Sequence, residues 1–470
     1  MSEDLYRRGA AELAELIRTG QATSVDVVQA HLDRIEAVNP ELNAITTVLA
    51  DQALAEARAA DERLAEGGPV GRLHGVPVTV KENIDVTGTP TTSGVPALAE
   101  AIAMTDSPVV ARMRDAGAIV IGRTNLPDLG LRIATESSLN GVTKNPWHPA
   151  RTAGGSSGGE ASAIASGMSP LGVGNDIGGS LRNPAHCCGI SSLKPTTGRV
   201  AHATEIPPED GGLSWQLMLV NGPMARTVAD VRLGFQVISG LDPRDPASVS
   251  APLEFPGWDV PTKVAVIAEP PGGRTDRGVA EVVWNAAAHL ADAGYEVEEI
   301  TPPEYEAVLE LWSDFLMTEL RLMQPTLDAV LGDSGKQFLF AALEDARDLD
   351  LAAYAGLFAE RRRLQRAWAA FLAEYPVILS PTWSQPAFEH GWDAQSTENS
   401  LATLELLRPV MPANALGLPA AATPGGIADG MPVGVQLITA AFREDQALRA
   451  AAVIEDAVGL TRPVDPFVNY

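Results

Sequence analysis

Residues 154–182 read GGSSGGEASAIASGMSPLGVGNDIGGSLR, a stretch rich in glycine and serine and almost free of charge. The surrounding segment, residues 141–200, holds 12 glycines and 8 serines but only 7 charged residues. Such a composition is typical of a flexible linker or of a site where the backbone comes close to a ligand. Apolar residues such as Ile164, Val173 and Ile177 recur through the segment. They argue against a linker, and we expect a tightly folded site here.

Outside this segment, helical and strand patterns alternate along the chain. Apolar residues at three- and four-residue spacing predict helices at 10–18, 25–38, 49–64, 109–115, 279–293, 303–324, 350–374, 402–416 and 445–458. Short apolar runs predict strands at 76–80, 118–121, 263–268, 295–300, 377–379 and 433–438. We expect Asn39 and Pro40 to end the second helix. The alternation predicts an α/β fold with a parallel or mixed sheet covered by helices, in one large domain spanning residues 1–470.

The composition narrows the class of protein. With 34 Lys and Arg against 60 Asp and Glu, the formal net charge is −26. Because such a chain repels phosphate backbones and its longest basic run is only 361–363, we expect no nucleic-acid partner. No signal peptide and no run of 18 apolar residues is present, so we expect a cytoplasmic protein without a membrane span. Cys187 and Cys188 are adjacent, which predicts no disulfide, and no metal-ligand spacing is present.

Three serine motifs compete for a catalytic role. GGSSG at 154–158 fits a nucleophile elbow, but the elbow needs a buried strand before it, and residues 145–152 lack that character. SSLK at 191–194 fits S-x-x-K without its companion motifs, so we interpret Lys194 as structural. DIGGS at 176–180 places two glycines before a serine, which lets successive N–H groups point at one position, as an oxyanion hole requires. A plain Gly-Gly-Ser turn remains the alternative.

A serine nucleophile also needs a base, and none of the 7 histidines lies in a pattern that identifies one. Lys81 is more suggestive because it ends the apolar run 76–80. Desolvation there would disfavour the ammonium form and make the amine a general base. From the sequence alone, Lys81 could equally reach solvent or pair with Glu82 or Asp85.

Four motifs together resemble the amidase signature family. They are GVPVTVKEN at 75–83, GGSSGGE at 154–160, GVGNDIGGSLRNPA at 172–185 and GISSLKPTTGR at 189–199. The resemblance is specific over about 75–200 and continues weakly to PVGVQL at 432–437. It implies an α/β fold with a central mixed sheet covered by helices on both faces. It also implies hydrolysis of carboxamide C–N bonds in aryl or alkyl amides, anilides or carbamates. It implies no metal and no cofactor.

The resemblance further implies a Ser–cisSer–Lys triad. Ser180 matches the nucleophile, Ser156 matches the bridging serine, whose peptide bond is cis in the family, and Lys81 matches the general base. The oxyanion hole matches the N–H groups of Ile177, Gly178, Gly179 and Ser180. Asp176 and Arg182 are implied as supports of that loop. A side activity on esters is expected, because esters are easier acyl donors than amides.

The substrate is less well specified. We expect a catalytic core at about 75–200 and segments that vary with substrate at about 200–215 and 303–415. The apolar residues of 349–375, with Trp312, Phe315, Met317, Leu320 and Met323, are interpreted mainly as core, with some of them lining an acyl or aryl pocket. The partner we expect is a small-molecule amide, and a homodimer is left open.

Two alternative functions stay open. The glutaminase subunit of a tRNA-dependent amidotransferase would need a polar, charge-paired pocket, and the apolar content of 303–324 argues weakly against it. A catalytically silent binding scaffold would have no use for the intact set of Lys81, Ser156 and Ser180.

Overall fold

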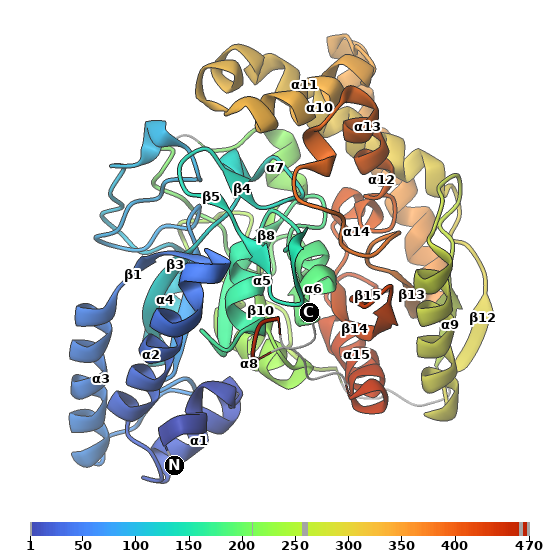
Figure 1. Ribbon diagram of the computed structural model, residues 1–470. Coiled ribbons are helices and arrows are strands. Elements are labelled where there is room, and N and C mark those ends of the chain that lie inside the picture. Colours follow the sequence, from blue (N-terminus) through green and yellow to red (C-terminus); the bar gives the residue numbers. More distant parts are fainter. Residues whose placement is uncertain (1, 209, 256–261, 460–463, 468–470) are drawn as a thin grey trace.

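A single large sheet organises the molecule. The computed structural model describes residues 2–208, 210–255, 262–459 and 464–467 (Figure 1). The sheet strands are β1 (Ile45–Val48), β2 (Pro77–Lys81), β3 (Ile119–Thr124), β8 (Leu171–Asp176), β9 (Ser191–Lys194), β10 (Val220–Ala225), β11 (Lys263–Val266), β12 (Glu296–Glu299), β13 (Val377–Pro381), β14 (Ala420–Ala428) and β15 (Met431–Thr439). Among the described residues they form one 11-stranded sheet in the order β1-β3-β2-β8-β10-β9-β14-β15-β13-β11-β12. β2 is parallel to β3 and to β8, whereas β14 is antiparallel to β9 and β15. The predicted mixed sheet is thus confirmed.

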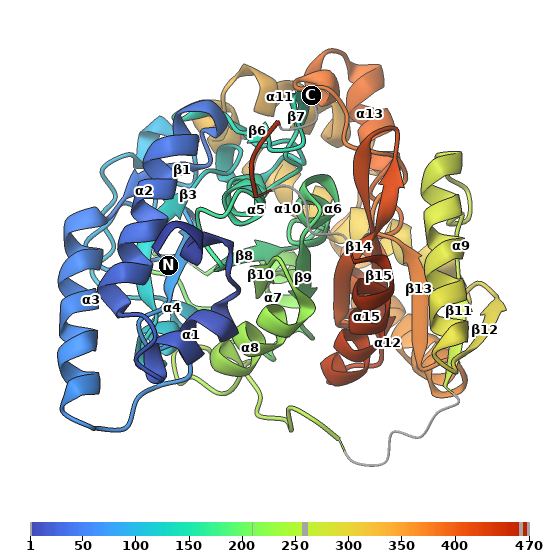
Figure 2. The same ribbon diagram turned by 60° about the horizontal axis from the view of Figure 1, so that its bottom comes forward.

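Helices cover both faces of this sheet (Figures 1 and 2). They are α1 (Ala10–Arg18), α2 (Ser24–Leu42), α3 (Ala50–Ala65), α4 (Pro108–Asp115), α5 (Gly158–Ala165), α6 (Arg182–Cys188), α7 (Leu213–Met218), α8 (Val228–Ile238), α9 (Arg277–Asp292), α10 (Tyr305–Val330), α11 (Asp333–Asp345), α12 (Leu351–Glu374), α13 (Thr397–Glu405), α14 (Met411–Leu416) and α15 (Glu444–Val458). Small hairpins pair β4 (Glu136–Ser137) with β5 (Gly141–Val142) and β6 (Lys144–Asn145) with β7 (His148–Thr152). The fold class of a single α/β domain is confirmed.

The side chains of β2 divide between the two faces of the sheet. Val78 and Val80 belong to the apolar cluster under α1, α4, α8, α9 and α15. Successive side chains of a strand point to opposite faces, so Thr79 and Lys81 face the other layer. That layer contains α5, whose Glu160 accepts a hydrogen bond from Thr79. Thr79 and Lys81, the polar residues of β2, therefore lie on the face of the sheet that α5 covers.

Proline positions account for two wrong predictions. α2 does not end at Asn39 and Pro40 but continues to Leu42, because a proline in the last turn removes a single N–H from the helix. The predicted helix 402–416 is two helices, α13 and α14. Pro409 and Pro412 lie where the first cannot continue and where the second begins.

Candidate active site

Two adjacent parallel strands carry the predicted residues to one edge of the sheet. β2 and β8 pair in parallel, with Thr79 opposite Gly172 and Val80 opposite Val173. Their carboxyl ends therefore meet, and Lys81 and Asp176 are the last residues of the two strands. In α/β sheets this edge is where ligands usually bind.

Lys81 is fully buried, and its side-chain nitrogen donates hydrogen bonds to two side-chain oxygen atoms. Its Nζ donates to Oγ of Ser156 at 2.7 Å and to Oδ1 of Asn175 at 2.6 Å. Asn175 in turn donates to Oδ1 of Asn83 at 3.0 Å. The Gly155–Ser156 peptide bond is cis. The structure thus brings Lys81 and Ser156 together, and it adds Asn175, which lies in the motif at 172–185 but had been given no role, because its partner comes from another strand.

Burial sets the charge state of this lysine. It lowers the pKa of Lys81 to about 7, although the negative charges of Asp176 and Glu160 act in the opposite direction. Glu160, in the first turn of α5, is also fully buried. It accepts hydrogen bonds from Thr79 and, at 2.8 Å, from Thr124. Burial raises the pKa of Glu160 to about 7. Glu160 was missed, although it is one of only two acidic residues in 141–200.

Ser180 lies in a loop between β8 and α6, residues 177–180, which we call the 177–180 loop. Only 6% of Ser180 is exposed, and its carbonyl oxygen accepts from the N–H of Ser157 at 3.3 Å. The turn that carries Ser156 therefore packs against the loop. The N–H groups of Ile177, Gly178 and Ser180 make no hydrogen bond within the described part of the chain. The N–H of Gly179 is occupied, since it donates to Oδ1 of Asp176 at 2.8 Å.

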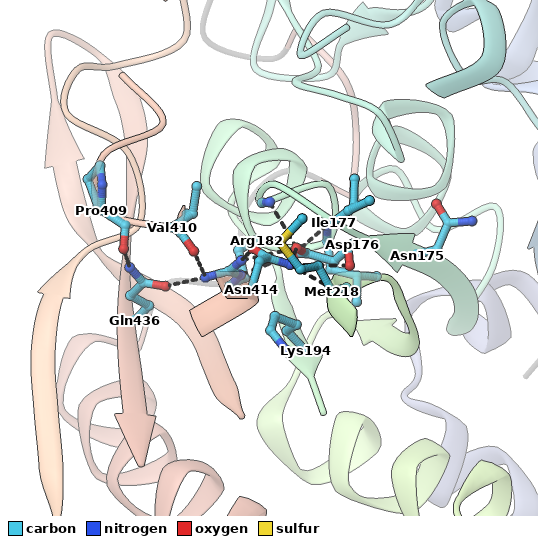
Figure 3. A network of polar contacts seen from close by, with 12 residues as sticks. Asn175, Asp176, Ile177, Arg182, Lys194, Met218, Pro409, Val410, Asn414 and Gln436 are labelled. Carbon is cyan, nitrogen blue, oxygen red and sulfur yellow. Dashed lines mark hydrogen bonds and ion pairs between the residues drawn. The ribbon is translucent and has the colours of Figure 1, made fainter. Parts of the chain in front are cut away.

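A buried ion pair braces the two ends of this loop (Figure 3). Arg182 donates from Nε and Nη2 to the carboxylate of Asp176, both at 3.0 Å. Its Nη1 reaches Oε1 of Gln436 on β15 at 2.9 Å and the carbonyl of Val410 at 3.0 Å, and its Nη2 reaches Oδ1 of Asn414 at 2.6 Å. Burial by itself would raise the pKa of Asp176, but the charge and hydrogen bonds of Arg182 hold it well below its usual range.

An apolar pocket opens beside Ser180. It is lined by Gly130, Leu131, Arg132, Ile133, Ile177, Gly178, Ser180, Trp312, Leu316, Met317, Leu320, Phe338, Leu339, Ala342, Leu404 and Leu407. Of the residues that sequence analysis singled out, Trp312, Met317 and Leu320 line it. Phe315, Met323 and the segment 349–375 do not, and α12 instead buries Leu364, Trp368 and Leu372 in the core.

The pocket offers little charge to a ligand. Arg132 is its ionisable lining residue. The guanidinium is already paired with Asp393, at 2.7 and 2.9 Å, and with Glu136, at 2.8 Å. No described residue of 200–215 lines the pocket, and residue 209 of that segment lies outside the described residues.

The competing serine motif at 191–194 does not bring its serine and lysine side chains together. Ser191 and Lys194 stand three residues apart on β9, so their side chains face opposite sides of the sheet. Ser191 contacts Thr423 and Glu455, and Lys194 donates to the carbonyl of Pro195 at 2.8 Å.

The stretch before GGSSG is not the buried strand of a nucleophile elbow either. β7 covers His148–Thr152 and is a half-exposed strand of a two-stranded hairpin. In the described ranges, no cluster of three or more His, Cys, Asp or Glu side chains could hold a metal ion. None of the described helices has both the length and the apolar character needed to cross a bilayer.

Comparison with known proteins gives consistent matches over nearly the whole chain. A sequence model of the family described as Amidase matches residues 26–448. Indoleacetamide hydrolase of Bradyrhizobium diazoefficiens is 44% identical over 460 residues, which are 97% of this chain and 87% of the relative. A glutamyl-tRNA(Gln) amidotransferase subunit of Acidothermus cellulolyticus is 34% identical over 493 residues, 97% and 95% of the two chains. The solved structure of 6-aminohexanoate cyclic dimer hydrolase complexed with substrate has a TM-score of 0.85 at 28% identity, covering 99% of this chain and 100% of that chain.

Proposed function

This chain belongs to the Amidase family and hydrolyses amide C–N bonds, and on that premise we propose a serine acyl-transfer mechanism with Ser180 as nucleophile. Ser156 relays the proton and Lys81 is the general base. The observation that carries the proposal is the 2.7 Å contact from Lys81 Nζ to Ser156 Oγ in a fully buried setting. With its pKa lowered to about 7, a substantial share of Lys81 is neutral near neutral pH and can accept a proton.

The proposed steps conserve atoms and charge. Lys81 takes a proton from Ser156, which takes the proton of Ser180, while Ser180 Oγ bonds to the amide carbon. The carbonyl electron pair moves to oxygen, where backbone N–H groups stabilise it. The proton returns to the leaving nitrogen, the C–N bond breaks, and an acyl-enzyme remains. Water, deprotonated through the same relay, then attacks the acyl carbon. The bond from that carbon to Ser180 Oγ breaks, Ser180 takes the proton back, and the acid leaves.

For the oxyanion hole we propose Ile177, Gly178, Gly179 and Ser180, supported by Asp176 and Arg182. Three of these N–H groups have no acceptor among the described residues. Gly179 differs, because its N–H would have to share its hydrogen bond to Asp176 with the substrate oxygen. We therefore assign the larger part of the stabilisation to Ile177, Gly178 and Ser180.

The apolar pocket favours an uncharged acyl group with an aromatic or alkyl body. Trp312, Leu316 and Phe338 offer such a group contact surface but no counter-charge. The Bradyrhizobium diazoefficiens relative is named for indoleacetamide hydrolysis. We therefore propose a primary amide of an arylacetic acid as the substrate, with esters of the same acids as side substrates. The segment 303–415 would be the variable, substrate-selecting part and 75–200 the catalytic core.

The amidotransferase alternative is disfavoured by the same pocket. Glutamine carries an ammonium and a carboxylate, and both need partners when they leave water. Arg132 is paired twice, with Asp393 and Glu136, so it offers no free charge. We propose further that the protein works in the cytoplasm without a nucleic-acid partner, with a homodimer as the assembly that light scattering would test.

Hydrolysis of a small panel tests the proposal. The panel holds indole-3-acetamide, glutamine, a short primary amide, an acyl anilide and an aryl carbamate, with Ser180→Ala measured beside the unaltered protein. We expect turnover of the arylacetamide and its loss by at least about 10³-fold in Ser180→Ala. Glutamine turnover alone, or full activity of the variant, would contradict the proposal.

A further inference from the structure

Each peptide group between residues 176 and 180 is held by a hydrogen bond, but not in the same way. The bonds are Asn414 Nδ2 to the Asp176 carbonyl at 3.3 Å, Trp312 Nε1 to the Ile177 carbonyl at 2.8 Å, Gly179 N to Asp176 Oδ1 at 2.8 Å and Asn183 N to the Gly179 carbonyl at 2.7 Å. Two of these bonds come from side chains outside the loop. Asn414 of α14 holds the Asp176–Ile177 peptide, and Trp312 of α10 holds the Ile177–Gly178 peptide.

The orientation of that peptide decides where the N–H of Gly178 points. In a trans peptide the C=O and N–H groups point in opposite directions. Holding the Ile177 carbonyl on the Trp312 indole thus fixes the direction of the Gly178 N–H. Glycine places few limits on its backbone angles, so without this bond the peptide can rotate and turn its carbonyl where the donor should be.

Trp312 and Gly178 are also fitted to each other. A Cβ on Gly178 would lie 2.7 Å from Cζ2 of Trp312, so the ring occupies the space that a side chain would need. Trp312 is 3% exposed, and the part of its ring that remains open lines the pocket beside Ser180. The same side chain thus contacts both the 177–180 loop and the space for the acyl group.

We propose that Trp312 is a positioning residue that holds the Gly178 N–H toward the oxygen of the tetrahedral intermediate. The inference rests on the proposed acyl-transfer mechanism, and it assigns to α10 a role in transition-state stabilisation as well as in forming the pocket wall. An acyl group packed on the indole also presses the ring onto Gly178. A substrate that fills the pocket therefore steadies the donor that its own carbonyl will use.

The test replaces the indole donor and leaves an aromatic ring. Trp312→Phe removes the N–H, and we expect kcat on the arylacetamide to fall by about 10- to 100-fold, because loss of a whole oxyanion donor costs about 10² to 10³. The smaller ring also loses some contact with the acyl group, which should affect KM and affinity for the carboxylic acid product alike, whereas the donor acts mainly in the transition state. Affinity for an arylalkyl boronic acid, which binds as a tetrahedral adduct, should therefore fall about as much as kcat/KM and at least about tenfold more than affinity for the product.

Trp368→Phe is the matched control. Trp368 is 1% exposed, lies on α12 away from the pocket, and donates its indole N–H to the carbonyl of Pro303 at 2.9 Å. The control loses a comparable buried hydrogen bond and should keep its kcat within about twofold. If Trp312→Phe does not fold, incorporation of 3-benzothienylalanine at position 312 keeps the shape of the ring and removes only the donor.

The outcomes separate the inference from the proposed function. If Ser180→Ala is inactive while Trp312→Phe keeps its kcat, or loses activity only through KM, the inference is wrong and the mechanism stands. If Ser180→Ala keeps its activity, the mechanism itself is wrong. A parallel loss of kcat and boronate affinity, absent from Trp368→Phe, supports the inference.

Discussion

At the scale of single residues, the proposed role of Lys81 as general base predicts the pH range of catalysis. A base must be neutral to accept a proton, and burial lowers the pKa of Lys81 to about 7. Below that pH the amine is protonated in the free enzyme. We therefore expect kcat/KM to fall about tenfold per pH unit below pH 7 and to level off above it. A profile of kcat/KM from pH 5 to 9 measures this, and a flat profile down to pH 5 would contradict it.

Glu160→Gln tests whether Lys81 is the group that titrates in this profile. Because its own pKa is about 7, the Glu160 side chain is a charged carboxylate mainly in the upper part of this pH range, and there it favours the charged form of Lys81. Its removal should therefore lower the pKa of Lys81 and move the point at which the profile levels off to lower pH. A glutamine side chain can keep hydrogen bonds with Thr79 and Thr124. Glu12→Gln, at an exposed residue, should leave this point of the profile in place. A shift to higher pH in Glu160→Gln would mean that another group titrates.

The candidate site could be predicted only where neighbours in sequence carry the chemistry. Ser156 and Ser180 lie in short glycine-rich motifs, and Lys81 ends an apolar run. Trp312 lies in an apolar segment and Asn175 in such a motif, but neither pattern predicts the hydrogen bond that the residue makes in the site. Each acts on an atom supplied by a segment far along the chain, Ile177 in one case and Lys81 in the other. Such contacts exist only after the sheet has assembled.

At the scale of elements, the Asp176–Arg182 ion pair joins β8 and α6 to the C-terminal half. Arg182→Leu would leave a buried carboxylate without its partner, and we expect it to lower the free energy of unfolding by about 3–5 kcal/mol. Arg277→Ala is the control, because its ion pair with Glu281 is 92% and 60% exposed and should matter by less than about 0.5 kcal/mol. Urea unfolding at pH 7 measures both, and equal midpoints for the two variants would contradict the expectation.

Two strands that sequence analysis missed, β10 and β14, are held by their neighbours and not by their own composition. β10 reads VNGPMA and β14 reads AAATPGGIA, both poor in the β-branched and aromatic residues that favour strands. Each is nevertheless bonded on both sides, β10 to β8 and β9, and β14 to β9 and β15. β2 was found because PVTVK shows both the β-branched residues and the burial of an interior strand.

At the scale of the whole molecule, the two halves of the chain supply different parts of the candidate site. The N-terminal half supplies Lys81, Ser156 and Ser180, and β9 pairs with β14 where the halves meet. Helices α10, α11 and α13, which gather at the top of Figure 1, come from the C-terminal half and wall the pocket. We therefore expect changes in these helices to alter the substrate while the proposed catalytic groups stay unchanged.

Two phenylalanines of α11 test whether these helices select the acyl group. Phe338 on α11 lines the pocket, whereas Phe340 on the same helix packs against the core without lining it. Phe338→Leu should lower kcat/KM for an arylacetamide by about tenfold or more, since a lost apolar contact costs about 1–3 kcal/mol in discrimination. Acetamide has only a methyl group to place in the pocket, so we expect its kcat/KM to stay within about twofold. Phe340→Leu should leave both values unchanged. If Phe338→Leu lowers both values equally, the helices stabilise the catalytic core and do not select the acyl group.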